Sequence, residues 1–162
     1  MIDINGIAHV QLSVTNVERS RPFYYRLLHE TFGMTIQYDE PDYFYCIGGR
    51  TGIGITPVDD ELRDDTFQQR RVGLHHVCFR LRSREDIDRL YEVLQDMGAR
   101  LVHPPEDGPW APGYYSVLFE DPDGIRIEVN FVPGRGHLDR GGRLGPGGEG
   151  PAERYGSGGL EG

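Results

Sequence analysis

One short stretch of this sequence occurs twice, and each copy carries a histidine. Residues 7–12 read Ile-Ala-His-Val-Gln-Leu, and residues 74–79 read Leu-His-His-Val-Cys-Phe. Each copy precedes a stretch with a helical pattern, and each half then closes on a glycine and an apolar strand, at residues 52–56 and 124–128. Because an internal repeat implies two similar structural units, it constrains the architecture before any single motif does.

Turn and capping signals divide each half into one helix and four strands. Thr15-Asn16-Val17-Glu18 and Ser83-Arg84-Glu85-Asp86 both have the form of a capping box, and Gly33 and Gly98 are suited to end the helices. Period-2 alternation and β-branched residues indicate the strands. The expected strands are residues 7–14, 34–38, 43–47 and 53–58, then 74–81, 100–103, 115–120 and 125–132, with helices over 17–32 and 85–97.

The predicted fold class is therefore α+β, with a βαβββ plan written twice. We expect a first module over residues 1–66 and a second over 67–133, with a polar linker over 59–71. Residues 134–162 are rich in glycine, proline and charge, so they offer too little apolar surface to offset their ordering entropy. We expect this last segment to be disordered.

Composition narrows the function classes. The formal net charge of −9 argues against general binding to nucleic acid or to a membrane surface. Two cysteines cannot form a disulfide framework, and the N-terminus has no signal-peptide pattern, so we expect a cytoplasmic protein. No apolar run approaches membrane-spanning length.

Three of the expected strands combine an apolar face with a polar face. Side chains alternate along a strand, so His9, His76 and Glu128 each share a face with polar neighbours while apolar residues point the other way. Two imidazoles and one carboxylate suit a catalytic divalent metal with open positions, such as Fe, Mn, Co, Ni or Zn. In the alignment of the two copies, Thr56 is the residue of the first copy equivalent to Glu128 of the second. Threonine is a poor ligand for such a metal. That position is left to water or substrate.

Plainer interpretations compete with this one. A single histidine in a strand is more often a structural residue, and His75 competes with His76 as the inward one, although it falls on the apolar phase. Arg80 and Arg126 lie two residues from His76 and Glu128, so they suit either an anionic substrate or ion pairs with nearby acids.

The two His-Val strands, the Phe23-Tyr24 helix and the Asp121-Pro122-Asp123-Gly124 turn before Glu128 resemble the vicinal oxygen chelate superfamily. It is also called the glyoxalase/bleomycin resistance/extradiol dioxygenase superfamily. The resemblance covers roughly residues 5–133 and implies paired βαβββ modules whose mixed sheet curls around a metal cavity. It implies divalent-metal chemistry on a small substrate with neighbouring oxygens, with His9, His76 and Glu128 as the metal ligands. We also expect a homodimer.

The subfamily stays open. Glyoxalase I has a glutamate, and methylmalonyl-CoA epimerase usually a glutamine, where this chain is aligned with Thr56. The extradiol dioxygenase signature has a tyrosine at the position of Leu118. The potassium-loop pattern of fosfomycin-resistance transferases is not convincing here, and bleomycin-binding proteins lack the ligands.

Two function classes follow. The first is a metal-dependent lyase, isomerase or dioxygenase, with Tyr115 or Gln11 as candidate catalytic groups; Tyr114 or a metal-bound hydroxide could also serve as the base. Candidate substrate-binding residues are Arg80, Arg126, Thr56 and Trp110. The second class is a protein that binds an antibiotic or toxin in a cavity lined by aromatic residues, including Trp110.

Overall fold

The structure, a computed structural model, describes residues 2 and 6–134. Nearly all of the predicted tail, residues 135–162, lies outside the described residues. The described residues divide into two compact units, the first reaching to residue 70 and including 121–125, the second comprising residues 71–120 and 126–134. The division thus follows residue 70, where 66 was predicted, and a short segment from the second half of the chain belongs to the first unit.

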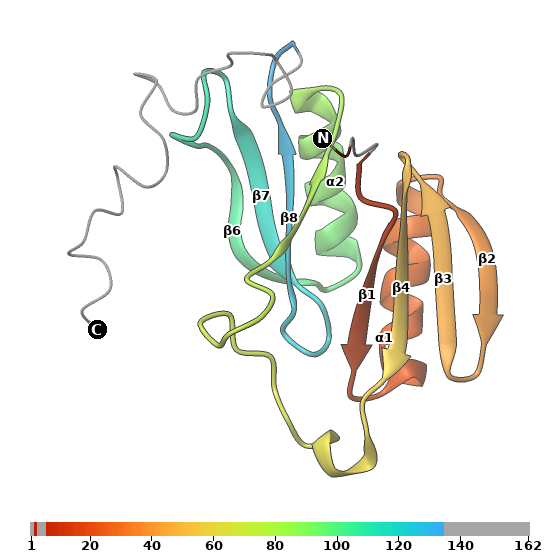
Figure 1. Ribbon diagram of the computed structural model, residues 1–162. Coiled ribbons are helices and arrows are strands. Elements are labelled where there is room, and N and C mark those ends of the chain that lie inside the picture. Colours follow the sequence, from red (N-terminus) through yellow and green to blue (C-terminus); the bar gives the residue numbers. More distant parts are fainter. Residues whose placement is uncertain (1, 3–5, 135–162) are drawn as a thin grey trace. The chain divides into compact units, whose positions relative to one another are not determined.

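The first unit is a four-stranded mixed sheet with one helical segment on one face (Figure 1). Its strand order is β1-β4-β3-β2, and only the β1–β4 pair is parallel. Its elements are β1 (His9–Val14), α1 (Val17–Tyr24), the π-helical η1 (Tyr25–Thr31), β2 (Thr35–Glu40), β3 (Tyr43–Gly48), β4 (Thr51–Pro57) and the short 3-10 turn η2 (Asp60–Leu62).

The second unit repeats this plan, with strand order β5-β8-β7-β6 and a parallel β5–β8 pair. Its elements are β5 (Val77–Arg80), α2 (Arg84–Asp96), β6 (Arg100–Asp107), β7 (Tyr115–Glu120) and β8 (Arg126–Phe131). The predicted α+β class with two βαβββ modules is confirmed. Strand β6 is longer than predicted, and it carries Pro104 and Pro105, which an edge strand tolerates because one side of it needs no ladder bonds.

Each sheet packs its apolar face against its own helix. In the first unit this layer contains Val14, Leu27, Phe44 and Ile55, all at 0% exposure. In the second it contains Ile87, Leu94, Phe119 and Val129, again at 0%. Fully burying one such side chain contributes roughly 1.5–3 kcal/mol, so these layers hold the fold together and leave the opposite sheet faces available for chemistry.

The N-terminus of α1 differs from the predicted capping box. Asn16 is the cap, since its side chain accepts the backbone N–H of Arg19 at 2.9 Å. Thr15 bonds to Asp123 with both its backbone N–H and its hydroxyl. Ser83 caps α2 as predicted, accepting the N–H of Asp86 at 3.1 Å.

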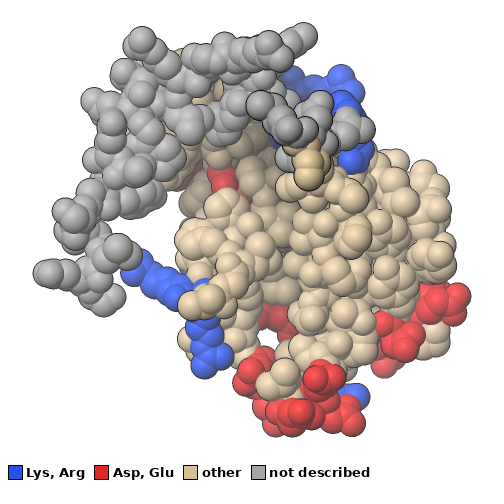
Figure 2. Space-filling model, viewed as in Figure 1, with Lys and Arg blue, Asp and Glu red and all other residues tan. Residues whose placement is uncertain are grey.

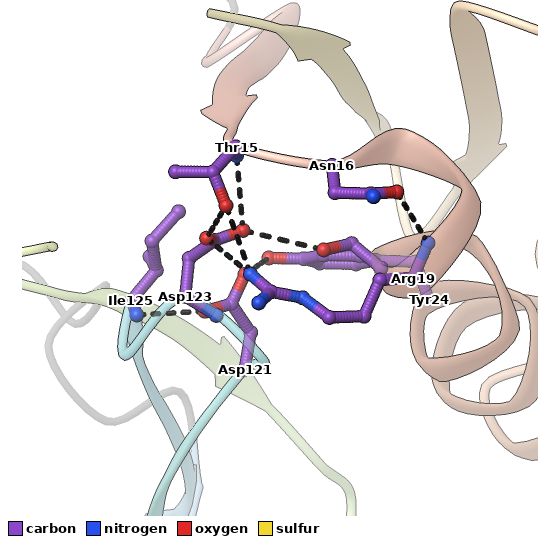
Figure 3. A network of polar contacts seen from close by, with 8 residues as sticks. Thr15, Asn16, Arg19, Tyr24, Asp121, Asp123 and Ile125 are labelled. Atoms are coloured by element: carbon purple, nitrogen blue, oxygen red, sulfur yellow. Dashed lines mark hydrogen bonds and ion pairs between the residues drawn. The ribbon is translucent and has the colours of Figure 1, made fainter. Parts of the chain in front are cut away.

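A polar network fixes the segment 121–125 within the first unit (Figure 3). Asp123 accepts hydrogen bonds from Thr15 and Ser20 and pairs with the Arg19 guanidinium at 2.6 Å. Tyr24 donates its phenolic hydrogen to Asp121 at 2.8 Å. Burial raises the pKa of Asp121 to about 6. The turn between β7 and β8 is therefore held by α1 and the residue before it.

Exposed acids of the first unit gather around the β2–β3 turn and after β4, visible as red side chains in the lower part of Figure 2. They are Asp39, Glu40, Asp42, Asp59, Asp60, Glu61, Asp64 and Asp65. Within the described residues, no helix has the length and apolar composition needed to cross a bilayer.

Candidate metal centre

His76 and Glu128 face each other in the second unit. The Nε2 atom of His76 lies 3.2 Å from Oε2 of Glu128, and the two side chains are 33% and 14% exposed. Glu128 projects from the middle of β8, and His76 directly precedes β5, the strand paired with β8. The sequence placed both residues on one face of these strands, and the structure brings them together.

The second oxygen of Glu128 is also engaged. The Tyr114 hydroxyl donates to Oε1 of Glu128, and Nδ2 of Asn130 donates to the Tyr114 oxygen at 3.1 Å. Burial raises the pKa of Glu128, but the hydrogen bonds from His76, Tyr114 and Ser116, together with the charge of His76, lower it by more, so it ends below its usual value. Burial, together with the Glu128 charge, raises the pKa of Tyr114 well above its ordinary value. The carboxylate is thus ionised and the phenol keeps its proton.

The loop before β7 places Tyr114 at this position. Tyr114 donates its backbone N–H to Ala111 and accepts that of Gly108, both at 3.0 Å. Its ring packs with Ala111 and Val132, and Trp110 lies against this cluster. A Cβ atom at Gly108 would lie 2.7 Å from the Tyr114 ring, so the close approach requires glycine there. Trp110, predicted to bind substrate, supports the tyrosine that holds Glu128.

Tyr115, the neighbouring candidate, is directed to the other side of the sheet. Its hydroxyl donates to Asp88 of α2 at 2.7 Å, and the Arg84 guanidinium lies 3.7 Å from its ring centroid. Tyr115 is the first residue of β7 and Tyr114 belongs to the loop before it, and their hydroxyls bond to different partners, Asp88 and Glu128. Tyr114 is the residue that contacts Glu128.

Both predicted substrate-binding arginines have partners within the second unit. Arg80 donates to the carbonyl oxygens of Val132 at 2.8 Å and Gly134 at 3.1 Å. The Nε atom of Arg126 lies 3.4 Å from Oε1 of Glu120. These contacts give each arginine a structural role, and a role toward substrate stays a prediction.

The equivalent face of the first unit carries His9 and a group of tyrosines. The rings of Tyr43 and Tyr45 are almost parallel, at 9° with centroids 6.0 Å apart, and the His9 ring lies edge-on to Tyr45 at 6.5 Å. Oε1 of Gln11 lies 3.5 Å from the Tyr43 hydroxyl. Tyr38 adjoins both tyrosines. This face offers aromatic surface next to the first predicted ligand.

The strand register corrects the predicted equivalence of Thr56 and Glu128. Cys78 pairs with Glu128 in the second unit, whereas Gln11, the counterpart of Cys78, pairs with Gly54. Gly54 therefore occupies the position of Glu128, and Thr56 lies two residues further along β4. The ring of Tyr45 uses the space, because a Cβ atom at Gly54 would lie 2.8 Å from it.

The His76–Glu128 pair fits a metal site. Two ligand atoms about 2.1 Å from one ion are separated by about 3 to 3.4 Å, and the observed 3.2 Å lies in this range. His9 belongs to the first unit, and the other two predicted ligands belong to the second. Among residues 2 and 6–134, no group of three histidine, cysteine, aspartate or glutamate side chains is close enough to hold a metal.

The sequence patterns did not single out two residues near Glu128, Tyr114 and Asn130. Tyr114 lies outside the regular strand, so alternation could not assign its face, and Asn130 reads as a neutral polar residue of β8. The glycines at 108 and 113 around Trp110 were the available signal for a tight loop. In the structure this loop completes the surroundings of Glu128.

Comparisons with known proteins agree on one family. Residues 6–129 match the family model described as Glyoxalase/Bleomycin resistance protein/Dioxygenase superfamily. Uncharacterized protein YqjT of Bacillus subtilis is 29% identical over 132 residues, covering 75% of this chain and 94% of that protein. Metallothiol transferase FosB of Shouchella clausii is 27% identical over 127 residues, covering 78% and 80%. The solved glyoxylase/bleomycin resistance protein/dioxygenase domain from Frankia sp. EAN1pec has a TM-score of 0.65 at 25% identity, covering 80% and 98%.

Proposed function

Because the chain belongs to the Glyoxalase/Bleomycin resistance protein/Dioxygenase superfamily, we propose that it is a divalent-metal-dependent enzyme. Its substrate is a small molecule with vicinal oxygens, and its reaction is that of a lyase, isomerase or dioxygenase. His9, His76 and Glu128 are the proposed ligands. The observation that carries the proposal is the 3.2 Å His76–Glu128 pair, whose carboxylate is largely buried and ionised.

The chemistry divides between the bound ion and the surrounding side chains. A divalent metal with open positions supplies Lewis acidity toward a substrate oxygen. Gln11 and Thr56, on the His9 face, supply amide and hydroxyl groups that orient a polar substrate. Arg80 and Arg126 add positive charge near Glu128, which favours a carboxylate-bearing molecule in a chain whose net charge is −9.

The metal is one of Fe, Mn, Co, Ni or Zn, all of which bind imidazole and carboxylate. The name of the Shouchella relative, a metallothiol transferase, supports metal dependence and adds group transfer to the possible reactions. We further propose a cytoplasmic homodimer. The two free cysteines, Cys46 and Cys78, suit a reducing compartment.

Metal binding by the full chain tests this function. The protein is stripped with chelator, dialysed against Fe²⁺, Mn²⁺, Co²⁺, Ni²⁺ or Zn²⁺ in separate samples, and analysed for bound metal alongside His9→Ala, His76→Ala and Glu128→Gln. We expect about one ion per chain for the unmodified protein and loss of tight binding in each variant. His103→Ala is the matched control, because the His103 ring contacts the Pro104 carbonyl on β6. Circular dichroism checks that the variants fold.

A wild-type chain that binds none of the five metals would contradict the proposal. A His9→Ala variant with full affinity would remove His9 from the ligand set. An activity screen of the metal-loaded protein across the three reaction types then assigns the reaction.

A second function has one specific observation in its favour. Tyr38, Tyr43 and Tyr45 form a continuous aromatic group on the first unit, with ring centroids 5.6 to 6.4 Å apart. Such a surface suits a protein that binds an antibiotic or toxin by stacking. Binding of aromatic ligands to metal-free protein, lost in Tyr45→Leu, would favour this alternative.

A further inference from the structure

We propose that Tyr114, oriented by Asn130, is a positioning residue that fixes the Glu128 carboxylate for metal binding. The proposal rests on the proposed function, since it concerns how one metal ligand is held. It adds two residues that the three-ligand pattern does not contain.

The direction of the hydrogen bonds follows from donor chemistry. The Asn130 Nδ2 group can only donate, so the Tyr114 oxygen accepts there, at 3.1 Å. The single hydroxyl hydrogen of Tyr114 is then directed to Oε1 of Glu128. If the Asn130 amide were flipped, its Oδ1 and Oε1 of Glu128 would both be acceptors next to the single hydroxyl hydrogen of Tyr114. Asn130 therefore selects the state in which Tyr114 donates to the carboxylate.

The donor is held rigidly. Tyr114 is 4% exposed and Asn130 is 7% exposed. The Tyr114 ring is enclosed by Ala111, Val132 and Trp110, and its backbone is bonded on both sides within the loop. A buried phenol that donates to a carboxylate oxygen holds that oxygen in place, because breaking the hydrogen bond inside the protein is costly.

The consequence falls on the other carboxylate oxygen. With Oε1 held by Tyr114, Oε2 is the oxygen beside His76 Nε2, at 3.2 Å. The side chains of Ser116 and Cys78 also hydrogen-bond to Glu128, but without the phenol the carboxylate loses the donor that holds Oε1, so binding a metal would require ordering this oxygen again. Partners that orient a metal ligand in this way typically change metal affinity by about 10- to 100-fold.

The chain offers a matched pair of variants in adjacent positions. Tyr114→Phe removes the hydroxyl that bonds to Glu128, whereas Tyr115→Phe removes one that bonds to Asp88 on the opposite face. Co²⁺ is titrated into each full-length, metal-stripped protein in competition with a chromogenic chelator, and the visible spectrum of the Co²⁺ form is recorded. We expect Tyr114→Phe to raise the Kd for Co²⁺ about 10- to 100-fold and to change the spectrum. Tyr115→Phe should match wild type in both.

Asn130→Leu provides a second variant, which leaves the phenol present but no longer oriented. It should raise the Kd by a smaller factor than Tyr114→Phe, and it keeps the proposal testable if Tyr114→Phe folds poorly. Wild-type protein that binds Co²⁺, with Tyr114→Phe and Asn130→Leu both within twofold of it, would overturn the positioning role alone. Wild-type protein that binds no Co²⁺ or other divalent metal would overturn the proposed function together with it.

Discussion

The two modules share a strand order but fill the same row of positions in opposite ways. In the first unit the row across the sheet is Gln11–Gly54–Tyr45, and in the second it is Cys78–Glu128–Leu118. A glycine in the middle strand lets the long outer side chains of the first row lie over it. A small cysteine on the outer strand of the second row leaves room for the central glutamate. Cross-strand size complementarity thus gives one module an aromatic surface and the other a largely buried carboxylate.

The turns of the two modules differ as well. Strands β3 and β4 are joined through Gly49 and Arg50, both at positive φ, which is a tight hairpin turn. Strands β7 and β8 are joined by residues 121–125, which belong to the first unit and are held by α1. The two modules therefore hold their last turn differently, one by local backbone geometry and the other by a polar network.

The largest expected effect comes from cutting that network at Asp123. Asp123→Ala removes the acceptor for Thr15 and Ser20 and the ion-pair partner of Arg19, whose own side chain is half-exposed. Because the buried Ser20 and the part-buried Thr15 lose their acceptor together, we expect about 2–4 kcal/mol loss in the free energy of unfolding, measured with urea. Asp42→Ala, at an exposed turn position, is the control and should cost less than about 0.5 kcal/mol. Asp42 lies in the turn between β2 and β3, so equal costs would show that the Asp123 network stabilises its turn no more than an exposed turn residue does.

A pH effect of similar size is expected from Asp121. Its pKa is raised to about 6 in the folded protein from an ordinary value of 3.8, with burial as the main cause. A carboxyl with a raised folded pKa binds its proton more tightly when folded, so its contribution to stability falls as pH rises from about 4 to about 6. The shift corresponds to about 3 kcal/mol.

Comparison with Asp121→Asn isolates this group, since every other titrating residue is common to both proteins. The variant should gain about 3 kcal/mol relative to wild type between pH 4 and pH 7 in urea unfolding, because the amide does not titrate. A difference that does not change with pH would mean that the turn holds Asp121 without desolvating its charge.

The architecture was predictable because it depends on patterns repeated along the sequence. Alternation in residues 7–14 and 125–132 assigned the faces of β1 and β8 correctly, and the Ser83 cap is where the sequence placed it. The proximity of His76 and Glu128 followed from the same alternation. Local periodicity is enough for such assignments because a strand exposes every second side chain to one side.

What the sequence could not supply was the register between strands. Matching Gly52 with Gly124 shifted the alignment of the two copies by two residues from the alignment that the strand pairs β1–β4 and β5–β8 give. Gly52 lies within β4, opposite His9, whereas Gly124 lies in the turn before β8, at φ +86°. Glycine is needed at the two positions for different reasons: at Gly52 because Tyr45 packs closely over it, and at Gly124 because the backbone is left-handed. The residue type alone does not tell these reasons apart. The face of Tyr114 was also beyond alternation, because it precedes β7.

The smallest expected effect tests whether Gly52 of β4 is a glycine because Tyr45 packs over it. A Cβ atom at Gly52 would lie 2.0 Å from the Tyr45 hydroxyl oxygen, so Gly52→Ala must displace the ring, at a cost of about 1–2 kcal/mol. In a Tyr45→Leu background the obstructing atoms are absent, and the cost should largely disappear. In a Tyr43→Leu background, which removes the parallel neighbouring ring, the cost should stay near its wild-type value. A double-mutant cycle on urea unfolding should therefore give a coupling of about 1 kcal/mol between Gly52 and Tyr45. Absence of coupling would mean that Gly52 is required by the backbone of β4. The position of the Tyr45 ring would then not depend on glycine at residue 52.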